Sequence, residues 1–113
     1  MTCRRILLLF ALLTLPVAAA RAQDLNQELW EAARKGDAAA VRALLDKGAD
    51  VNAKFRYNAT ALSYAADKGH TEVVKILIER GADVNVRDTF YQATPLSWAT
   101  GKGHVAIIQA LLD

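Results

Sequence analysis

Cysteine is nearly absent from this 113-residue chain, whose single copy is Cys3. No disulfide can therefore form within the chain, and the fold must be held together by packing. An apolar run long enough to cross a bilayer is also missing, because Ile6 to Leu15 supplies about ten residues where about twenty are needed. The length allows one small domain and is too short for two.

The N-terminal segment has the features of a secretory signal peptide. Arg4 and Arg5 precede the apolar run, and Ala20-Arg21-Ala22 has the form of a cleavage site. We expect residues 1–22 to be a cleaved signal peptide and residues 23–113 to be the mature domain, secreted or periplasmic. The alternative is an uncleaved membrane anchor.

An excess of positive charge is missing once that segment is set aside. The chain has 14 Lys and Arg against 12 Asp and Glu, but three of the arginines precede residue 23, which leaves eleven against twelve. Binding to nucleic acid depends on a clear positive excess. We therefore expect no nucleic-acid partner, and no membrane association after cleavage of the signal.

What the sequence does contain is a repeat. Its glycines Gly36, Gly69 and Gly103 are 33 and 34 residues apart, and "RALLDKGADVN" returns as "KILIERGADVN". Thr60 and Thr94 stand where a hydroxyl would cap a short helix, which the next glycine would end. A second helix follows with apolar residues spaced by three and four. Because neither helix can bury its apolar face alone, we expect an all-α solenoid of stacked helix pairs.

This repeat resembles the ankyrin repeat. The family's T-P-L-H-x-A motif is matched by residues 60–65 (TALSYA) and 94–99 (TPLSWA), and its G-A-D-V-N loop by residues 48–52 and 81–85. Serine replaces the motif histidine in both copies, which we expect to slacken those turns. The resemblance implies helix-turn-helix units joined by finger loops, in repeats at about 25–57, 58–91 and 92–113.

The third unit stops at Asp113 with apolar residues on its last helix that nothing in the sequence covers: Ile107, Ile108, Leu111 and Leu112. Three explanations stay open. The sequence is a fragment of a longer array, or a partner or second copy covers this face, or the array simply terminates imperfectly.

Groups that could perform chemistry do not converge in this pattern. His70 and His104 occupy equivalent places in neighbouring repeats, about 8–10 Å apart, which is too far to share a metal ion. We interpret them as helix-start residues that bond to the adjacent loop. The Asp-Val-Asn triplets at 50–52 and 83–85 are interpreted as turn-shaping rather than calcium-binding. We expect no enzyme activity, no metal and no cofactor.

The resemblance implies that finger loops and first helices line a concave, partner-binding groove. Leu62, Tyr64, Leu96 and Trp98 are expected to pack between repeats instead. The candidate partner-binding residues are Arg34, Lys35, Arg56, Tyr57, Asp67, Lys68, Thr89, Phe90, Tyr91, Gln92 and Lys102.

Two patterns stand out among these candidates. Lys35, Lys68 and Lys102 are equivalent by repeat and should form a basic row that favours an acidic partner, unless they are ordinary solvated lysines. The fingers also hold four of the seven aromatic residues after position 22: Phe55, Tyr57, Phe90 and Tyr91. We expect the two tyrosines, which are equivalent by repeat, to be neighbours. Each phenylalanine is expected either to anchor a partner or to fold inward under its finger.

The function that we infer from the sequence is a non-enzymatic protein–protein interaction module, binding through its finger loops and concave face. One alternative is a structural segment of a larger repeat array or homo-oligomer. Another is a regulatory part of a longer secreted protein.

Overall fold

The computed structural model describes residues 17–113, with side chains from Asp24 onward, and every regular element in this range is helical. The all-α prediction is confirmed. The elements are α2 (Val17–Lys35), α3 (Ala38–Asp46), the 3₁₀ turn η1 (Arg56–Asn58), α4 (Ala61–Lys68), α5 (Thr71–Glu79), α6 (Pro95–Lys102) and α7 (Val105–Leu112).

The expected signal peptide falls largely outside the described residues, which exclude its apolar run. Helix α2 spans the predicted cleavage point after Ala22. None of the helices in residues 17–113 has the length and apolar character that a bilayer crossing requires. Cleavage of residues 1–22 stays a prediction.

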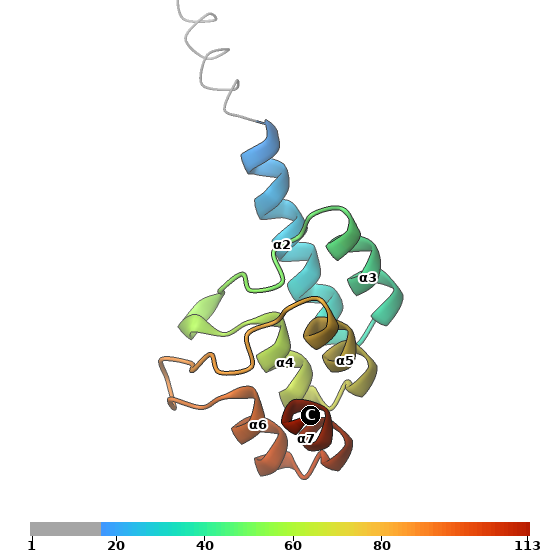
Figure 1. Ribbon diagram of the computed structural model, residues 1–113. Coiled ribbons are helices and arrows are strands. Elements are labelled where there is room, and N and C mark those ends of the chain that lie inside the picture. Colours follow the sequence, from blue (N-terminus) through green and yellow to red (C-terminus); the bar gives the residue numbers. More distant parts are fainter. Residues whose placement is uncertain (1–16) are drawn as a thin grey trace, which may run out of the picture.

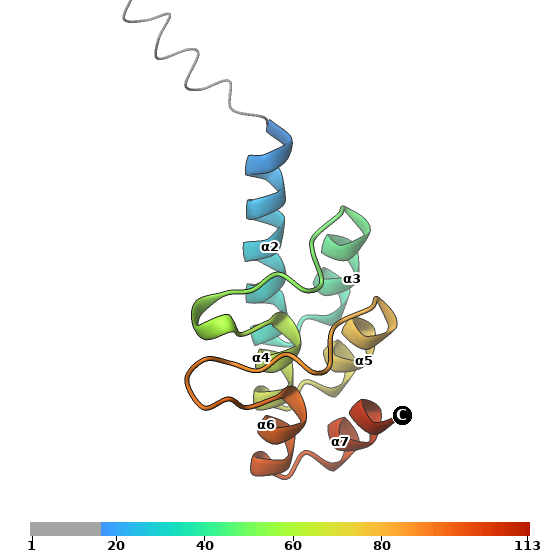
Figure 2. The ribbon, with the colours of Figure 1, turned by 60° about the vertical axis from the view of Figure 1, so that its left-hand side comes forward.

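The helices form two layers (Figures 1 and 2). The first helix of each pair, α2, α4 and α6, stacks on the next, and the second helices α3, α5 and α7 stack beside them. The loops between pairs project to one side as two fingers, residues 54–59 and 87–93. Figure 2 shows both fingers beside the layer of first helices.

The helix starts follow the sequence pattern. The Thr60 and Thr94 hydroxyls accept hydrogen bonds from the backbone N–H of Ser63, at 3.3 Å, and of Ser97, at 3.2 Å. The expectation that serine slackens these turns is wrong. The Ser63 hydroxyl lies 3.2 Å from that of Thr60 and closes a capping box, so it restores a local hydrogen bond at the position of the motif histidine.

The ends of the first helices are held close to the next repeat by the two histidines. The Nε2–H of His70 donates to the backbone carbonyl oxygen of Arg34 at 2.9 Å. The Nε2–H of His104 donates to the backbone carbonyl oxygen of Asp67 at 3.3 Å. Both imidazoles lie against glycines with left-handed backbone, Gly36 and Gly69, where an added Cβ would come within 2.5 Å and 2.7 Å of the ring. The histidines thus have the expected structural role at helix starts, but each bonds to the last turn of the first helix of the preceding repeat and not to the adjacent loop. The short Cβ distances show why the glycines are needed.

The core lies between the two layers. Its fully buried side chains include Leu29, Leu62, Val73, Leu77 and Ile107. Replacing one of them with alanine should cost about 2–5 kcal/mol of unfolding free energy.

The turns after the second helices are shaped as the sequence predicts. Asp50 accepts from the N–H of Asn52, and Asp83 from that of Asn85, both at 2.9 Å. The Asn52 side chain also accepts from the N–H of Asp83 at 2.7 Å, which links one turn to the next.

The apolar face of α7 is only partly open. Ile107 is fully buried, in contact with the rest of the core, whereas Val105 is 65% exposed and Leu112 68%. The expectation that part of this face lies open is confirmed, with Leu112 open and Ile107 covered. Ile108 and Leu111 are half-buried.

Candidate partner-binding cleft

The tip of the first finger has an unusual backbone. Tyr57 and Asn58 have φ values of 58° and 63°, in the left-handed region that side chains disfavour. The Phe55 N–H donates to the Ala59 carbonyl at 2.8 Å and closes the loop around this tip. The Tyr57 side chain projects outward as a result and is 60% exposed.

The two fingers are tied to each other. The Thr89 N–H donates to the Tyr57 carbonyl at 2.8 Å, and the Asn58 side-chain amide donates to the Arg87 carbonyl at 2.9 Å. These bonds bring backbone from two repeats into register. The tip conformation positions the Tyr57 carbonyl and the Asn58 side-chain amide for these bonds. The left-handed backbone of the two residues therefore has a structural role.

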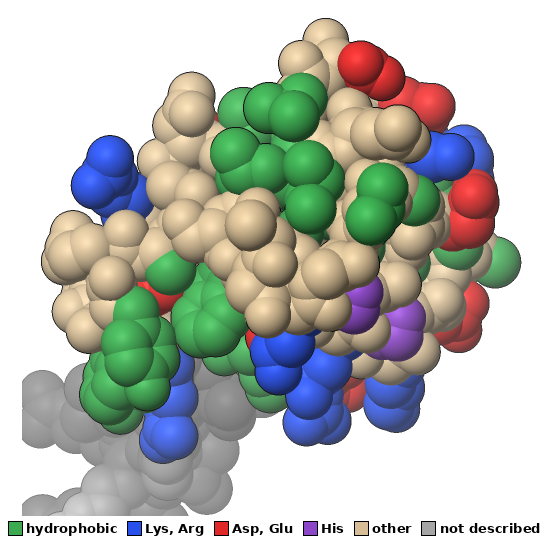
Figure 3. All heavy atoms as spheres, turned by 90° about the horizontal axis from the view of Figure 1, so that it is seen from below, with side chains coloured by type: hydrophobic (Ala, Val, Ile, Leu, Met, Phe, Trp, Pro, Cys, Tyr) green, Lys and Arg blue, Asp and Glu red, His purple; other side chains and the backbone are tan. Residues whose placement is uncertain are grey.

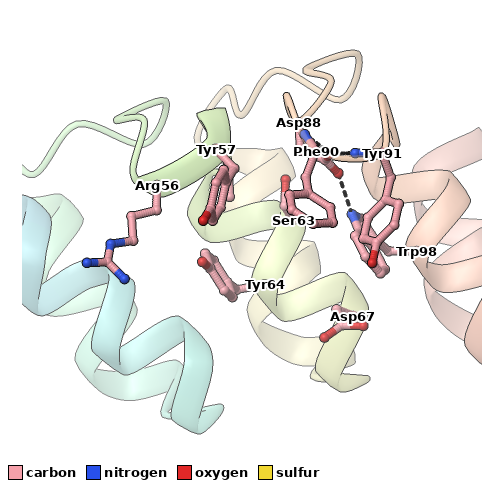
Figure 4. A pocket seen from close by; sticks show the side chains of 10 residues that line it. Arg56, Tyr57, Ser63, Tyr64, Asp67, Asp88, Phe90, Tyr91 and Trp98 are labelled. Carbon is pink, nitrogen blue, oxygen red and sulfur yellow. Dashed lines mark hydrogen bonds between the residues drawn. The ribbon is translucent and has the colours of Figure 1, made fainter.

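A buried carboxylate, Asp88, organises the second finger. One of its oxygens accepts from the backbone N–H groups of Phe90, at 3.0 Å, and Tyr91, at 2.6 Å. The other accepts from the Trp98 indole N–H at 3.1 Å (Figure 4). Asp88 thus fixes the finger to helix α6, and the sequence analysis missed it. An aspartate placed two and three residues before exposed aromatic residues is the signal that could have revealed it.

Four aromatic side chains form a continuous series, which we call the aromatic row: Tyr57, Phe90, Tyr91 and Trp98. Successive ring centroids lie 5.4, 4.6 and 5.8 Å apart, each pair edge to face. Phe90 and Tyr91 are 62% and 68% exposed. The expected tyrosine pair is thus corrected, because Phe90 lies between Tyr57 and Tyr91.

The two phenylalanines differ in direction. Phe55 is half-buried and packs on Trp30 with ring centroids 5.8 Å apart. Phe90 points outward in the aromatic row. Of the two alternatives left open for each, inward packing holds for Phe55 and outward exposure for Phe90.

Beneath the aromatic row lies a cleft of about 300 Å³ between the fingers and the first helices α4 and α6. Five of the predicted residues line it: Arg56, Tyr57, Asp67, Phe90 and Tyr91. The remaining lining residues are Ala59, Ser63, Tyr64, Asp88 and Trp98.

The expectation for the residues packed between repeats needs a correction. Leu62 is buried and Leu96 half-buried, as expected. Tyr64 packs on Trp30 at 5.4 Å and Trp98 on Tyr91, yet both also line the cleft. Large rings at these positions cover a neighbouring repeat with one part and reach the groove with another.

The other predicted residues lie outside the cleft. Thr89 and Gln92 are exposed at the tip of the second finger. Lys35, Lys68 and Lys102 end the three stacked first helices, so they do form a row. Figure 3 shows Lys and Arg side chains gathered along one edge beside the two histidines.

Two cations of this edge already have partners. The Arg34 guanidinium lies over the Trp30 ring, 5.1 Å from its centroid. The Lys102 ammonium is 3.8 Å from the Asp67 carboxylate. Within the row of Lys35, Lys68 and Lys102, Lys102 therefore differs from the other two because it has an acidic partner.

The described residues contain no group of three or more His, Cys, Asp or Glu side chains placed to hold a metal ion. Both imidazoles are engaged through Nε2 with backbone carbonyls. What the cleft offers is aromatic surface with two carboxylates, Asp67 and Asp88, and one guanidinium, Arg56. Such a surface is suited to binding.

Comparison with known proteins supports the repeat architecture directly. The family model for ankyrin repeats (3 copies) matches residues 8–88 and, in an overlapping match, residues 29–113. No curated protein matches the chain. With three helix pairs, capped and stacked as described, and a family match over most of its length, the chain belongs to the ankyrin repeat family, whose members generally act in protein–protein interaction.

Proposed function

We propose that this chain is a non-enzymatic module that binds another protein through its finger loops and concave face, with the cleft at the centre of the contact. The observation that carries the proposal is the exposure of Tyr57, Phe90 and Tyr91, each at least 60% exposed, on one continuous surface. Large exposed aromatic residues are unfavourable in water unless a partner covers them, and they are enriched among interface anchors.

The fixed position of these rings supports the same proposal. Asp88 holds Phe90 and Tyr91 through their backbone, and two hydrogen bonds join the fingers. A surface ordered before binding loses little conformational entropy when the partner arrives. This arrangement favours binding over a purely structural use of the aromatic residues.

An acidic patch on the partner is part of the proposal. Lys35 and Lys68 are exposed at the ends of α2 and α4, and Lys68 directly follows Asp67 of the cleft in the sequence. Carboxylates facing this edge would raise the association rate, and added salt would lower it.

The first test identifies the partner by crosslinking it to the second finger. A photo-crosslinking residue replaces Gln92 at the exposed finger tip and, as a matched control, Lys75 on the outer side of α5, in full-length protein in its native compartment. We expect a protein crosslinked from position 92 and not from position 75. Equal yields from both positions would contradict the proposal.

Affinity then tests the aromatic anchors. We expect the purified partner to bind the double variant Tyr57→Ala, Tyr91→Ala at least about tenfold more weakly than wild type, with the melting temperature nearly unchanged. A control variant, Lys75→Ala with Glu79→Ala, should bind as wild type does. Parallel loss of stability and affinity would show that the tyrosines are structural.

A second candidate function rests on helix α7. Val105 and Leu112 are exposed there, and either a second copy or a further repeat could cover them. Light scattering over a concentration series would report self-association, which Leu112→Glu should abolish. A monomer at high concentration would remove the homo-oligomer from consideration.

We further propose that the protein is secreted or periplasmic, either alone or as a regulatory part of a longer secreted protein. The support is the sequence of residues 1–22 alone. N-terminal mass spectrometry of the exported protein should find Gln23 first. Recovery of Met1 in the exported form would contradict cleavage.

A further inference from the structure

We propose that the cleft receives an arginine side chain of the partner protein, with its guanidinium between the aromatic walls and against Asp67. This inference rests on the proposed function, because it names what the partner places at the centre of the contact. The arrangement of rings and charges around the cleft supports an arginine.

The walls of the cleft are aromatic on both sides (Figure 4). Tyr57 and Tyr64 lie on one side, and Phe90, Tyr91 and Trp98 on the other. Five rings from four segments, the two fingers and helices α4 and α6, thus surround one space of about 300 Å³. The negative face of an aromatic ring attracts a cation, most often a guanidinium, and this attraction is stronger where water is excluded.

The acidic group that could complete such a site is Asp67. It lies at the lower end of the cleft in Figure 4, on the last turn of α4, with its side chain 27% exposed. Its only cationic partner within the described residues is Lys102, at 3.8 Å, which is beyond hydrogen-bond distance. An oxygen of Asp67 can therefore still accept a short hydrogen bond from a ligand N–H.

The other charges around the cleft are compatible with a cation. Asp88 adds a second carboxylate, although its oxygens are already engaged by three N–H donors. Arg56 stands at the rim, and its guanidinium extends away from the aromatic walls (Figure 4). Within the walls the ligand thus meets aromatic rings and carboxylates, a combination that favours a cation over an anion.

Arginine suits these walls better than lysine does. Its guanidinium is planar, stacks on rings and is more weakly hydrated than an ammonium, so entering an aromatic slot costs it less. It also presents N–H groups in its plane, which can reach the Asp67 carboxylate while its faces contact the rings.

The experiment uses the full-length protein labelled with ¹⁵N and three small probes. They are N-acetyl-arginine methylamide, the neutral near-isostere N-acetyl-citrulline methylamide, and N-acetyl-lysine methylamide. The reporter is the indole N–H resonance of Trp98, with that of Trp30, which does not line the cleft, as internal reference. We expect a saturable shift at Trp98 with the arginine probe and affinities at least about fivefold lower for citrulline and lysine.

Charge variants sharpen the test because they act in opposite directions. Asp67→Asn should weaken the arginine probe at least about threefold, whereas Lys102→Gln should strengthen it by freeing the carboxylate. Lys68→Gln, the equivalent lysine one repeat earlier, is the control for a general change in charge and should have a smaller effect.

Several results would overturn the inference. They are equal affinity for arginine and citrulline, equal affinity for lysine, an unshifted Trp98 resonance, or an Asp67→Asn variant that binds as wild type does. If these occur while partner binding still depends on Tyr57 and Tyr91, the arginine site is wrong and the proposed function stands. If the arginine probe binds but the Tyr57→Ala, Tyr91→Ala variant binds the partner as wild type does, the proposed function is wrong. The claim that the partner supplies the arginine is then wrong as well.

Discussion

The two fingers come from equivalent places in successive repeats, yet they use their aromatic residues in opposite ways. In the first finger Phe55 turns inward against Trp30 and leaves one exposed ring, that of Tyr57. In the second, Phe90 and Tyr91 both face outward. The first finger is built on a packed side chain and the second on a buried carboxylate, Asp88. The second finger is also one residue longer than the first, as the spacings of 33 and 34 residues between the repeat glycines indicate. A repeat can therefore keep its backbone plan while this inserted residue changes what its loop presents.

The largest effect is expected from removing the carboxylate that distinguishes the second finger. Asp88→Ala deletes three acceptor contacts and leaves the half-buried Trp98 indole N–H without its partner. We expect a loss of about 2–3 kcal/mol in unfolding free energy, measured by urea denaturation. Asp83→Ala removes one exposed turn bond and serves as the control, with a loss of about 1 kcal/mol or less.

If Asp88→Ala proves no more costly than Asp83→Ala, the second finger does not depend on its carboxylate. The contrast between the two fingers would then have to be explained by the inserted residue alone.

Next in size is the difference between the phenylalanines. Phe55→Ala removes a ring packed on Trp30 and should cost about 1–2 kcal/mol of unfolding free energy, since the ring is only half-buried. Phe90→Ala should cost clearly less, because that side chain is 62% exposed. It should instead weaken partner binding. Paired denaturation and affinity measurements check both variants, and similar profiles for the two would erase the contrast.

The smallest effect concerns two left-handed residues at equivalent positions, Asn58 and Gln92, with φ of 63° and 55°. Glycine adopts this conformation without strain, so Gln92→Gly should raise the unfolding free energy by about 0.5–1 kcal/mol. Asn58→Gly should show no such gain, because it also loses the side-chain hydrogen bond to Arg87. Thermal melts of the two variants provide the comparison, and an equal gain from both would mean that the bond between the fingers contributes little.

The part of the fold that the sequence predicts is the part fixed by local chemistry. Thr60 caps α4 through Ser63, three residues further on, and Gly69 ends that helix with its own left-handed backbone, so both roles are visible in the local sequence. The contact of Gly69 with the His104 ring is the part that the local sequence does not reveal. The row of Lys35, Lys68 and Lys102 follows from the period alone.

What the sequence could not predict depends on contacts between repeats. The direction of Phe55 follows from the presence of Trp30, and the position of Phe90 between two tyrosines follows from the hydrogen bonds that join the fingers. Tyr64 was expected to be covered, and its place in the cleft wall appears only when the fingers are in position. The period identifies equivalent residues, but one inserted residue is enough to make equivalent side chains unequal.

The contact between histidine and glycine has a consequence for how closely a partner must fit. At one edge of the stack an imidazole lies so near Gly36 or Gly69 that not even a methyl group could enter, and at the other edge the fingers are bonded together. The last two repeats are thus joined at both edges. Bending them apart would break either the bond from His104 to Asp67 or the hydrogen bonds between the fingers. We therefore expect the surface of these two repeats to be preformed, so that a protein that binds there must be complementary to it in shape.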